Sequence, residues 1–243
     1  MPVRAPAIRL TRAGVAFEGE ALFAGLDLEI AGGRWTCLLG PSGVGKSTVL
    51  RLVAGLVPGT SGTTVVADDG TAVAGRVAFM AQQDLLLPWL DARGTVLLGA
   101  RMRGETPDRR RADALLADLG LAAAAAQRPA ALSGGMRQRV ALARTLMEDR
   151  PFVLMDEPFA AVDAVTRLKL QALAADRLAG RTVLLVTHDP LEALRLGHRV
   201  LVMTGRPATL SAPIDPPGPP LRAVDDPAVL ALQGELLRRL AAD

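Results

Sequence analysis

Hydrophobic and polar residues alternate along the first thirty positions of the chain. The apolar positions fall two residues apart, at Ile8 and Leu10 and again at Leu26, Leu28 and Ile30. Successive side chains of a strand point to opposite faces of a sheet. This spacing therefore predicts half-buried antiparallel strands between residues 8 and 30.

Farther along, short apolar runs alternate with stretches of helical spacing. Continuous apolar runs predict buried strands at 35–39 and 182–187 and in the run 152–157, which ends in two carboxylates. Further strands are expected at 63–67, 76–80, 199–203 and 208–210. Helices are predicted at 46–56, 133–149, 164–179 and from Asp226 onward. Strands that alternate with helices predict an α/β fold.

Residues 91–126 depart from this alternation and follow a helical period. Their apolar positions are Val96, Leu97, Ala100, Leu115, Leu116 and Leu119. The run Ala122–Ala126 adds residues of high helix propensity. We therefore expect a helical insertion within the strand–helix chain.

A glycine-rich motif lies between the predicted strand 35–39 and the predicted helix 46–56. It fits G-x-x-x-x-G-K-[ST] and consists of Gly40, Pro41, Ser42, Gly43, Val44, Gly45, Lys46, Ser47 and Thr48. Glycines let backbone N–H groups close around a β-phosphate. Lys46 can reach the β- and γ-phosphates, and the Ser47 hydroxyl can bind Mg²⁺. The unpaired N–H groups of the following helix favour an anion as well. The motif therefore predicts a site for a nucleoside triphosphate.

Polar residues at the ends of two buried strands are candidates for the chemistry. In a phosphate-loop fold, an aspartate such as Asp156 lies near Mg²⁺, and the adjacent Glu157 can order an attacking water. His188 follows the strand 182–187 at the end where ligands gather in open α/β sheets. His198 lacks that context and is expected to be structural.

Three further features are weaker on their own. Ser133, Gly134 and Gly135 open a predicted helix and form a second anion-binding terminus, although Ser-Gly-Gly is also a common helix start. Gln82 follows a predicted strand and is equally consistent with an ordinary surface residue. Phe17 precedes the phosphate loop in the sequence. A lone phenylalanine more often packs in the core than binds a ligand.

Composition narrows the function classes. The net charge is only +3, and aromatic residues make up 3% of the chain with no tyrosine, which leaves few platforms for stacking nucleic-acid bases. The basic run Arg109–Arg111 is typical of a solvated helix face. Cys37 lies in an apolar strand and is expected in the core. No apolar window is long enough to span a membrane, and the N-terminus lacks a signal peptide, so we expect a cytoplasmic location.

Together and in this order, these motifs resemble an ATP-binding-cassette ATPase. The resemblance rests on the phosphate loop, Leu132-Ser133-Gly134-Gly135, Val153-Leu154-Met155-Asp156-Glu157-Pro158 and His188, and it extends over about residues 8–203. It implies a P-loop NTPase (RecA-like) core with an antiparallel β subdomain and an inserted α-helical subdomain. The single ATPase domain, 1–243, would then have its core at about 1–83 and 150–243 and its helical signature subdomain at about 84–149.

The resemblance also implies roles for individual residues, with ATP and Mg²⁺ as cofactors. Phe17 would stack on adenine, so the resemblance favours a functional role for Phe17 over core packing. Gln82 would contact Mg²⁺ or the water near the γ-phosphate. Ser133 and Gly135 would grip the γ-phosphate of ATP on the opposite subunit. Asp156 would organise Mg²⁺, Glu157 would be the catalytic base, Asp163 would match the D-loop aspartate and His188 would sense the γ-phosphate.

Two positions depart from the family pattern. Met136 stands where the signature commonly has glutamine, and Ala160 stands where the D-loop usually begins with a hydroxyl residue. Neither departure removes a group that hydrolysis needs.

The partners that the resemblance implies are a second copy of the chain arranged head to tail, a membrane permease subunit and, indirectly, an extracytoplasmic solute-binding protein, with no nucleic acid. The ATPase would lie on the cytoplasmic face of the cell membrane. Leu86-Leu87-Pro88-Trp89 resembles importers of nitrate, sulfonate, taurine and pyrimidine precursors, and other short stretches resemble hydroxymethylpyrimidine (thiamine-precursor) members. Trp89 is also consistent with a packing residue of the helical insertion. The alternatives are a soluble cassette ATPase for cofactor assembly, nucleic-acid repair or translation, and an exporter ATPase.

Overall fold

A computed structural model describes residues 5–241 of the chain, which divides into two compact units. Unit 1 comprises Met1–Val77, Pro151–Asp156 and Ala179–Asp243, and unit 2 comprises Ala78–Arg150 and Glu157–Leu178. The division of the chain into a core and a helical signature subdomain at about residues 84 and 149 stays a prediction.

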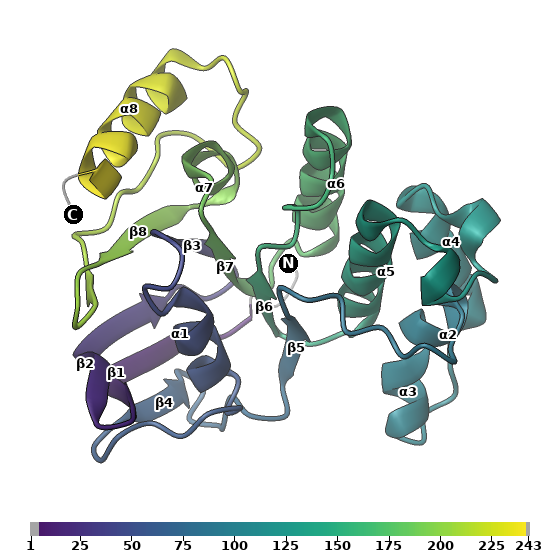
Figure 1. Cartoon of the computed structure of the whole chain (residues 1–243), viewed down its shortest axis with the longest axis horizontal. Coiled ribbons are helices and arrows are strands. Elements are labelled where there is room, and N and C mark those ends of the chain that lie inside the picture. Colours follow the sequence, from purple (N-terminus) through teal and green to yellow (C-terminus); the bar gives the residue numbers. More distant parts are fainter. Residues whose placement is uncertain (1–4, 242–243) are drawn as a thin grey trace. The chain divides into compact units, whose positions relative to one another are not determined.

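A three-stranded antiparallel sheet in unit 1 contains the alternating N-terminal segment (Figure 1). Its strands are β1 (Ile8–Phe17), β2 (Glu20–Ile30) and β4 (Thr64–Ala67), in the order β2-β1-β4. β1 and β2 pair from Ile8 opposite Ile30 to Phe17 opposite Glu20, with shifts of register between Leu10 and Ala16. The apolar members of the alternation face inward, since Ile8, Leu10 and Ile30 are at most 1% exposed. The predicted antiparallel strands are confirmed.

The larger sheet contains the continuously apolar runs. Within unit 1 its strands follow the order β6-β7-β3-β8-β9. They are β3 (Trp35–Leu39), β6 (Phe152–Asp156), β7 (Thr182–Thr187), β8 (Arg199–Thr204) and β9 (Thr209–Leu210). The strand pairs β6–β7, β7–β3 and β3–β8 are parallel, and β9 is antiparallel to β8. Every residue of β3, β6 and β7 is buried, as expected for a sheet covered on both faces.

Helices cover this sheet within unit 1 (Figure 1). Helix α1 (Lys46–Val53) packs against β6 and β7. It ends earlier than the predicted residue 56 because Gly55 turns to a φ of 72° and Leu56 donates its N–H to the Arg51 carbonyl, which closes the helix.

Two more helices, α7 (Pro190–Leu196) and α8 (Pro227–Ala241), pack against each other, with α7 also on β3 and β7 and α8 on β8. Helix α8 was predicted from the sequence, whereas α7 was not. The start of α7 carried a signal: Asp189 caps the helix through the N–H groups of Leu191 and Glu192, and Pro190 occupies the first helical position.

Unit 2 is mainly helical. After β5 (Val77–Met80), it contains α2 (Ala92–Val96), α3 (Leu98–Met102), α4 (Arg109–Asp118), α5 (Gly134–Met147) and α6 (Ala164–Arg177). Helices α2, α4 and α5 pack pairwise, which confirms a helical insertion in residues 91–126. The prediction of an α-helix for Ala122–Ala126 is wrong in detail, because the run forms only a 3-10 turn at Ala122–Ala124. Gly120, with φ 69°, and the buried Leu121 set the chain direction there against alanine's propensity.

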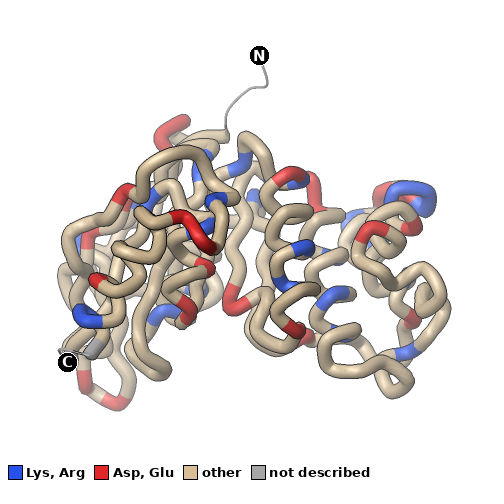
Figure 2. The backbone as a smooth tube through the Cα atoms, turned by 90° about the horizontal axis from the view of Figure 1, so that it is seen from above, with Lys and Arg blue, Asp and Glu red and all other residues tan. Residues whose placement is uncertain are grey.

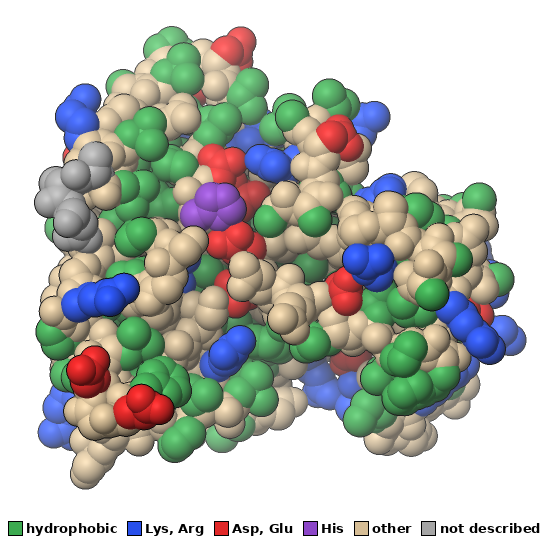
Figure 3. Space-filling model, in the orientation of Figure 1, with side chains coloured by type: hydrophobic (Ala, Val, Ile, Leu, Met, Phe, Trp, Pro, Cys, Tyr) green, Lys and Arg blue, Asp and Glu red, His purple; other side chains and the backbone are tan. Residues whose placement is uncertain are grey.

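Charged residues of both signs are mixed along the backbone of both units (Figure 2). The face displayed in Figure 3 likewise carries basic and acidic side chains among hydrophobic ones. Arg109–Arg111 are exposed at the start of α4, as predicted. Across residues 5–241, every helix falls short of the length and apolar character needed to cross a membrane.

Candidate functional site

The phosphate loop begins where β3 leaves the centre of the parallel sheet. A Cβ atom at Gly40 would collide with the carbonyl oxygen of Met203 at the end of β8, so only glycine fits there. Gly43 has φ 81° and Gly45 has φ 112°, which side-chain-bearing residues rarely adopt. Gly45 is the N-cap of α1 and provides no capping side chain. The N–H groups at the start of α1 therefore border the loop, which is the arrangement that binds phosphate.

Lys46 is held within this loop. Its ammonium Nζ donates hydrogen bonds to the carbonyl oxygens of Gly40 at 2.7 Å and Pro41 at 2.8 Å. The side chain is only 5% exposed, so its charge is largely shielded from water. A buried ammonium that is held by loop carbonyls favours an anion at the same place.

The carboxyl ends of neighbouring strands bring further predicted residues to the same edge of the sheet. Leu39, the last residue of β3, lies opposite Thr187 of β7, and Asp156, the last residue of β6, lies opposite Val186. The strands are parallel, so Gly40, Asp156 and His188 share one edge, as ligand-binding residues do in open α/β sheets. Asp156 is 2% exposed, whereas His188 is exposed.

Unit 1 also contains three other residues for which the sequence made a prediction. Phe17, at the end of β1, is 57% exposed, so it is not a core-packing residue. His198 is structural: its Nδ1 accepts a hydrogen bond from the Trp35 N–H at 3.0 Å, and its own N–H donates to the Trp35 carbonyl. Cys37 is fully buried in β3, and burial raises the pKa of its thiol.

Unit 2 contains the other predicted residues. Ser133 is the N-cap of α5, and its Oγ accepts a hydrogen bond from the Met136 N–H at 3.2 Å. Asp163 is the N-cap of α6, and the N–H of Thr166 donates to its carboxylate at 3.0 Å. This hydrogen bond lowers the pKa of Asp163. Gly134 is exposed, and a Cβ at Gly135 would lie 3.0 Å from the Ala161 carbonyl oxygen.

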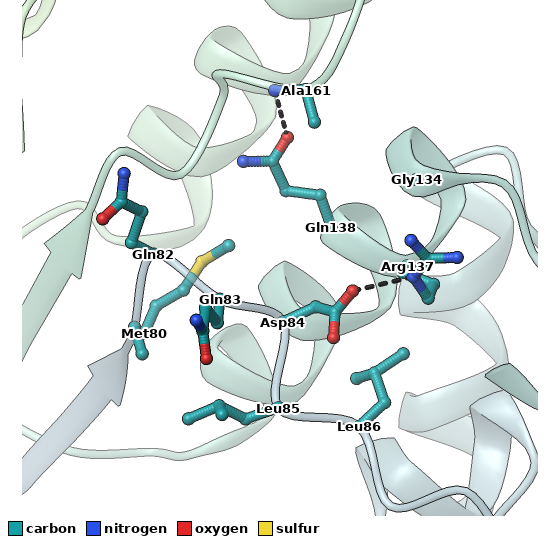
Figure 4. A pocket seen from close by; sticks show the side chains of 11 residues that line it. Met80, Gln82, Gln83, Asp84, Leu85, Leu86, Gly134, Arg137, Gln138 and Ala161 are labelled. Carbon is teal, nitrogen blue, oxygen red and sulfur yellow. Dashed lines mark hydrogen bonds and ion pairs between the residues drawn. The ribbon is translucent and has the colours of Figure 1, made fainter.

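Gln82 lines a pocket of about 410 Å³ that is formed within unit 2 (Figure 4). The segment after β5 forms one wall and the start of α5 forms another. The lining residues are Met80, Ala81, Gln82, Gln83, Asp84, Leu85, Leu86, Gly134, Arg137, Gln138 and Ala161. Gln82 and Gly134 were predicted from the sequence as site residues, whereas Arg137 and Gln138 were not.

Ionic and backbone contacts from α5 hold the pocket wall that contains Gln82. Arg137 Nε donates to Asp84 Oδ2 at 2.9 Å, a contact drawn in Figure 4. Arg144 donates to the carbonyl oxygens of Asp84 at 3.1 Å and Leu85 at 3.0 Å. Burial lowers the pKa of Arg144. Helix α5 therefore fixes the segment that begins at Gln82.

Glu157 follows Asp156 in the chain and has an unusual backbone conformation. Its φ of 49° lies in the left-handed region, which is costly for a residue with a side chain. The following Pro158 disfavours that conformation further, because a residue before proline prefers an extended backbone. Strain of this kind concentrates at functional positions.

The fold and the phosphate loop define a P-loop NTPase that binds ATP. The family model described as ABC transporter matches residues 23–160. The chain belongs to the ABC transporter family and is an ABC-type ATPase.

Several relatives align over nearly the whole chain. The aliphatic sulfonates import ATP-binding protein SsuB 3 of Nocardia farcinica is 44% identical over 240 residues, which cover 98% of this chain and 92% of the relative. SsuB of Rhodopseudomonas palustris is 42% identical, and the alignment covers 98% of this chain and 85% of that relative. An uncharacterized ABC transporter ATP-binding protein of Haemophilus influenzae is 40% identical, and the alignment covers 97% of this chain and 99% of that relative.

A solved structure has the same fold. The ATP-binding cassette MJ0796, in a dimeric post-hydrolysis state bound to ADP and Pi, superposes with a TM-score of 0.76 at 29% identity. The superposition covers 89% of this chain and 99% of that one.

Proposed function

We propose that the chain is the ATP-hydrolysing subunit that energises a membrane importer. The observation that carries the proposal is the glycine-built phosphate loop, in which Lys46 is buried, at the sheet edge shared by Asp156 and His188. Import is supported by relatives more than 40% identical that are named aliphatic sulfonates import ATP-binding proteins.

In this proposal, the loop from Gly40 to Thr48 binds the phosphates through its backbone N–H groups, and Lys46 neutralises the β- and γ-phosphate oxygens. Phe17 stacks on adenine. Its exposed ring supports this role, because a buried ring would have no face to offer.

The donor set fits Mg²⁺, which prefers hard oxygen ligands. Ser47 supplies a hydroxyl from the first turn of α1, and α1 packs on β6, which ends at the Asp156 carboxylate. The resemblance to cassette ATPases adds the amide oxygen of Gln82 to this proposed set. When bound, Mg²⁺ would neutralise charge on the transferring phosphoryl group.

Glu157 acts as the general base that orients the attacking water and accepts its proton, while His188 senses the γ-phosphate. The left-handed backbone at Glu157 is consistent with a side chain whose direction is imposed by its surroundings.

Two copies arranged head to tail would complete each site, since one chain has a single phosphate loop and a single signature helix. Ser133, Gly134 and Gly135 would then bind the γ-phosphate held by the partner, with Asp163 beside them. The dimeric state named for the similar cassette MJ0796 supports this assembly.

The proposed membrane partner is a permease that docks at the pocket beside Gln82, with a solute-binding protein outside the membrane acting indirectly. Trp89, which the sequence left open as a packing residue, is 65% exposed in unit 2 and is available to such a partner. The ATPase would then lie peripherally on the cytoplasmic face. An aliphatic sulfonate is favoured as the solute by the names of the relatives, and hydroxymethylpyrimidine stays a prediction.

The decisive variant is Glu157→Gln, which keeps nucleotide binding and removes the base. We expect turnover to fall roughly 10²–10⁴-fold, the usual contribution of a general base. With ATP and Mg²⁺, the variant should elute as a dimer from a size-exclusion column. Lys46→Ala is the control, because it should bind no ATP and stay monomeric.

The same trapped variant tests the importer assignment. Purified from gently solubilised cells with ATP and Mg²⁺, it should bring a multi-span membrane protein with it, and Lys46→Ala should bring less. Soluble partners alone would move the function to cofactor assembly or nucleic-acid work. Net export by the reconstituted complex would favour the exporter alternative.

A further inference from the structure

We propose that Gln138 is a positioning residue for Glu157, an inference that rests on the proposed role of Glu157 as the base. Gln138 lies in the second turn of α5 and is 8% exposed. Its side-chain amide forms two hydrogen bonds with the segment 157–161. Nε2 donates to the Glu157 carbonyl oxygen at 2.9 Å, and Oε1 accepts from the Ala161 N–H at 2.7 Å.

This pair of contacts requires a primary amide. The Glu157 carbonyl can only accept and the Ala161 N–H can only donate, so the two partners determine which end of the amide faces which. A carboxylate could satisfy the N–H group but not the carbonyl, and an apolar side chain could satisfy neither. Figure 4 shows the Gln138 side chain reaching from α5 to Ala161.

The segment 157–161 depends on the hydrogen bonds from Gln138 because its own internal hydrogen bond is long. The Ala160 N–H donates to the Glu157 carbonyl oxygen at 3.4 Å, whereas the Gln138 contact with the same oxygen is 2.9 Å. The side chain of Phe159, 1% exposed, anchors the middle of the segment. Gln138 anchors both of its ends, and one of those ends is the strained peptide of Glu157.

The consequence is that Gln138 fixes the direction of the Glu157 side chain. Because the Cα–Cβ direction follows from the backbone, a Glu157 that relaxes from φ 49° to an extended conformation would swing its carboxylate away from its present direction. Displacing a catalytic group by about 1 Å can cost about 10²-fold in rate. Gln138 therefore influences turnover without touching ATP.

Helix α5 also connects the two Gln138 hydrogen bonds to the pocket wall that contains Gln82. Arg137, the residue before Gln138, pairs with Asp84, and Arg144 holds the carbonyls of Asp84 and Leu85. A partner that shifts the Asp84 segment would act on the same helix that holds Glu157. The geometry thus supplies a physical connection within unit 2 from the pocket to the base.

The test compares Gln138→Met, Gln138→Glu and a control in the same helix. Gln138→Met keeps the side-chain length and removes both hydrogen bonds, whereas Gln138→Glu removes only the donor to Glu157. Thr145→Val removes a buried hydrogen bond, from Thr145 Oγ1 to the Ala141 carbonyl at 3.0 Å, that does not involve residues 157–161. All rates are normalised to the fraction of protein that binds ATP, so a loss of folded protein does not register.

We expect kcat to fall about 10- to 100-fold in both Gln138 variants, as for a displaced catalytic group. The KM for ATP and ATP-dependent dimer formation should be unchanged, and Thr145→Val should match the wild type. Wild-type kcat in Gln138→Met or in Gln138→Glu would overturn the inference. If Gln138→Met does not fold, Gln138→Glu decides alone.

Glu157→Gln is measured in parallel to separate the two proposals. If it loses turnover while the Gln138 variants keep theirs, only the positioning role fails. If it keeps turnover, Glu157 is not the base and both proposals fail.

Discussion

Replacing Arg222 by methionine should destabilise unit 1 strongly. Arg222 is 6% exposed, and its guanidinium donates all five of its N–H groups to backbone carbonyls. Two of the acceptors lie at the end of α7, and the other three lie in the proline-rich segment 216–218, a few residues before Arg222. The acceptors are Leu194 and Gly197, at 2.8 Å each, and Pro216 at 2.7 Å, Pro217 at 2.7 Å and Gly218 at 2.6 Å.

The magnitude follows from two opposing effects. Hydrogen bonds to a charged group contribute about 1.5–3 kcal/mol each, but burying the guanidinium costs several kcal/mol. This burial lowers the pKa of Arg222. Methionine carries no charge to bury, so the loss of five hydrogen bonds, at least about 7.5 kcal/mol, is partly offset by the several kcal/mol that burying the charge costs, and we expect a net loss of about 3–5 kcal/mol. Arg222→Lys keeps the charge but has three donors, so two bonds are lost and a loss of at least about 3 kcal/mol is expected.

The assay is urea unfolding followed by tryptophan fluorescence. Trp35, 4% exposed in β3, reports on unit 1, and a Trp89→Phe background removes the exposed tryptophan of unit 2. Arg238→Met, at an exposed arginine of α8, is the matched control and should change the free energy of unfolding by less than about 0.5 kcal/mol. A loss below about 1 kcal/mol for Arg222→Met would refute the reasoning, because it would place Arg222 among ordinary surface positions.

Two further predictions concern unit 1. Cys37 should react with a thiol reagent at pH 8 only after unfolding, because burial excludes the reagent and raises the thiol's pKa; comparable rates for native and unfolded protein would contradict its place in the core. The hydrogen bond from Arg76 lowers the pKa of Asp69 from its ordinary 3.8, so its contribution to stability is full above that pH and is lost as pH falls further. The difference in melting temperature between wild type and Asp69→Asn should therefore shrink between pH 6 and pH 2, and a constant difference would argue against the ion pair.

Elements whose signals are local follow directly from the sequence. Alternating or continuous hydrophobicity reports burial on one or two faces, so β1, β2, β3, β6 and β7 were predictable from the residues alone. The phosphate loop was equally predictable from the sequence, because its positions favour glycine. Gly43 and Gly45 have a left-handed backbone, and Met203 lies too close to Gly40 for a side chain. The same local reasoning failed at Ala122–Ala126, where the turn at Gly120 overrode helix propensity.

Features that depend on contacts between distant segments became apparent only in the fold. Hydrophobic pattern does not encode strand order, so the shared edge of Gly40, Asp156 and His188 came from the parallel register. Phe17 and Trp89 were ambiguous in sequence because an aromatic residue suits a core or a surface equally, and exposure resolved both. Gln138 and Arg222 carried no local signal at all. Their importance lies in which carbonyls and N–H groups the fold brings within reach of one side chain, several of them from residues about 20 to 30 positions away.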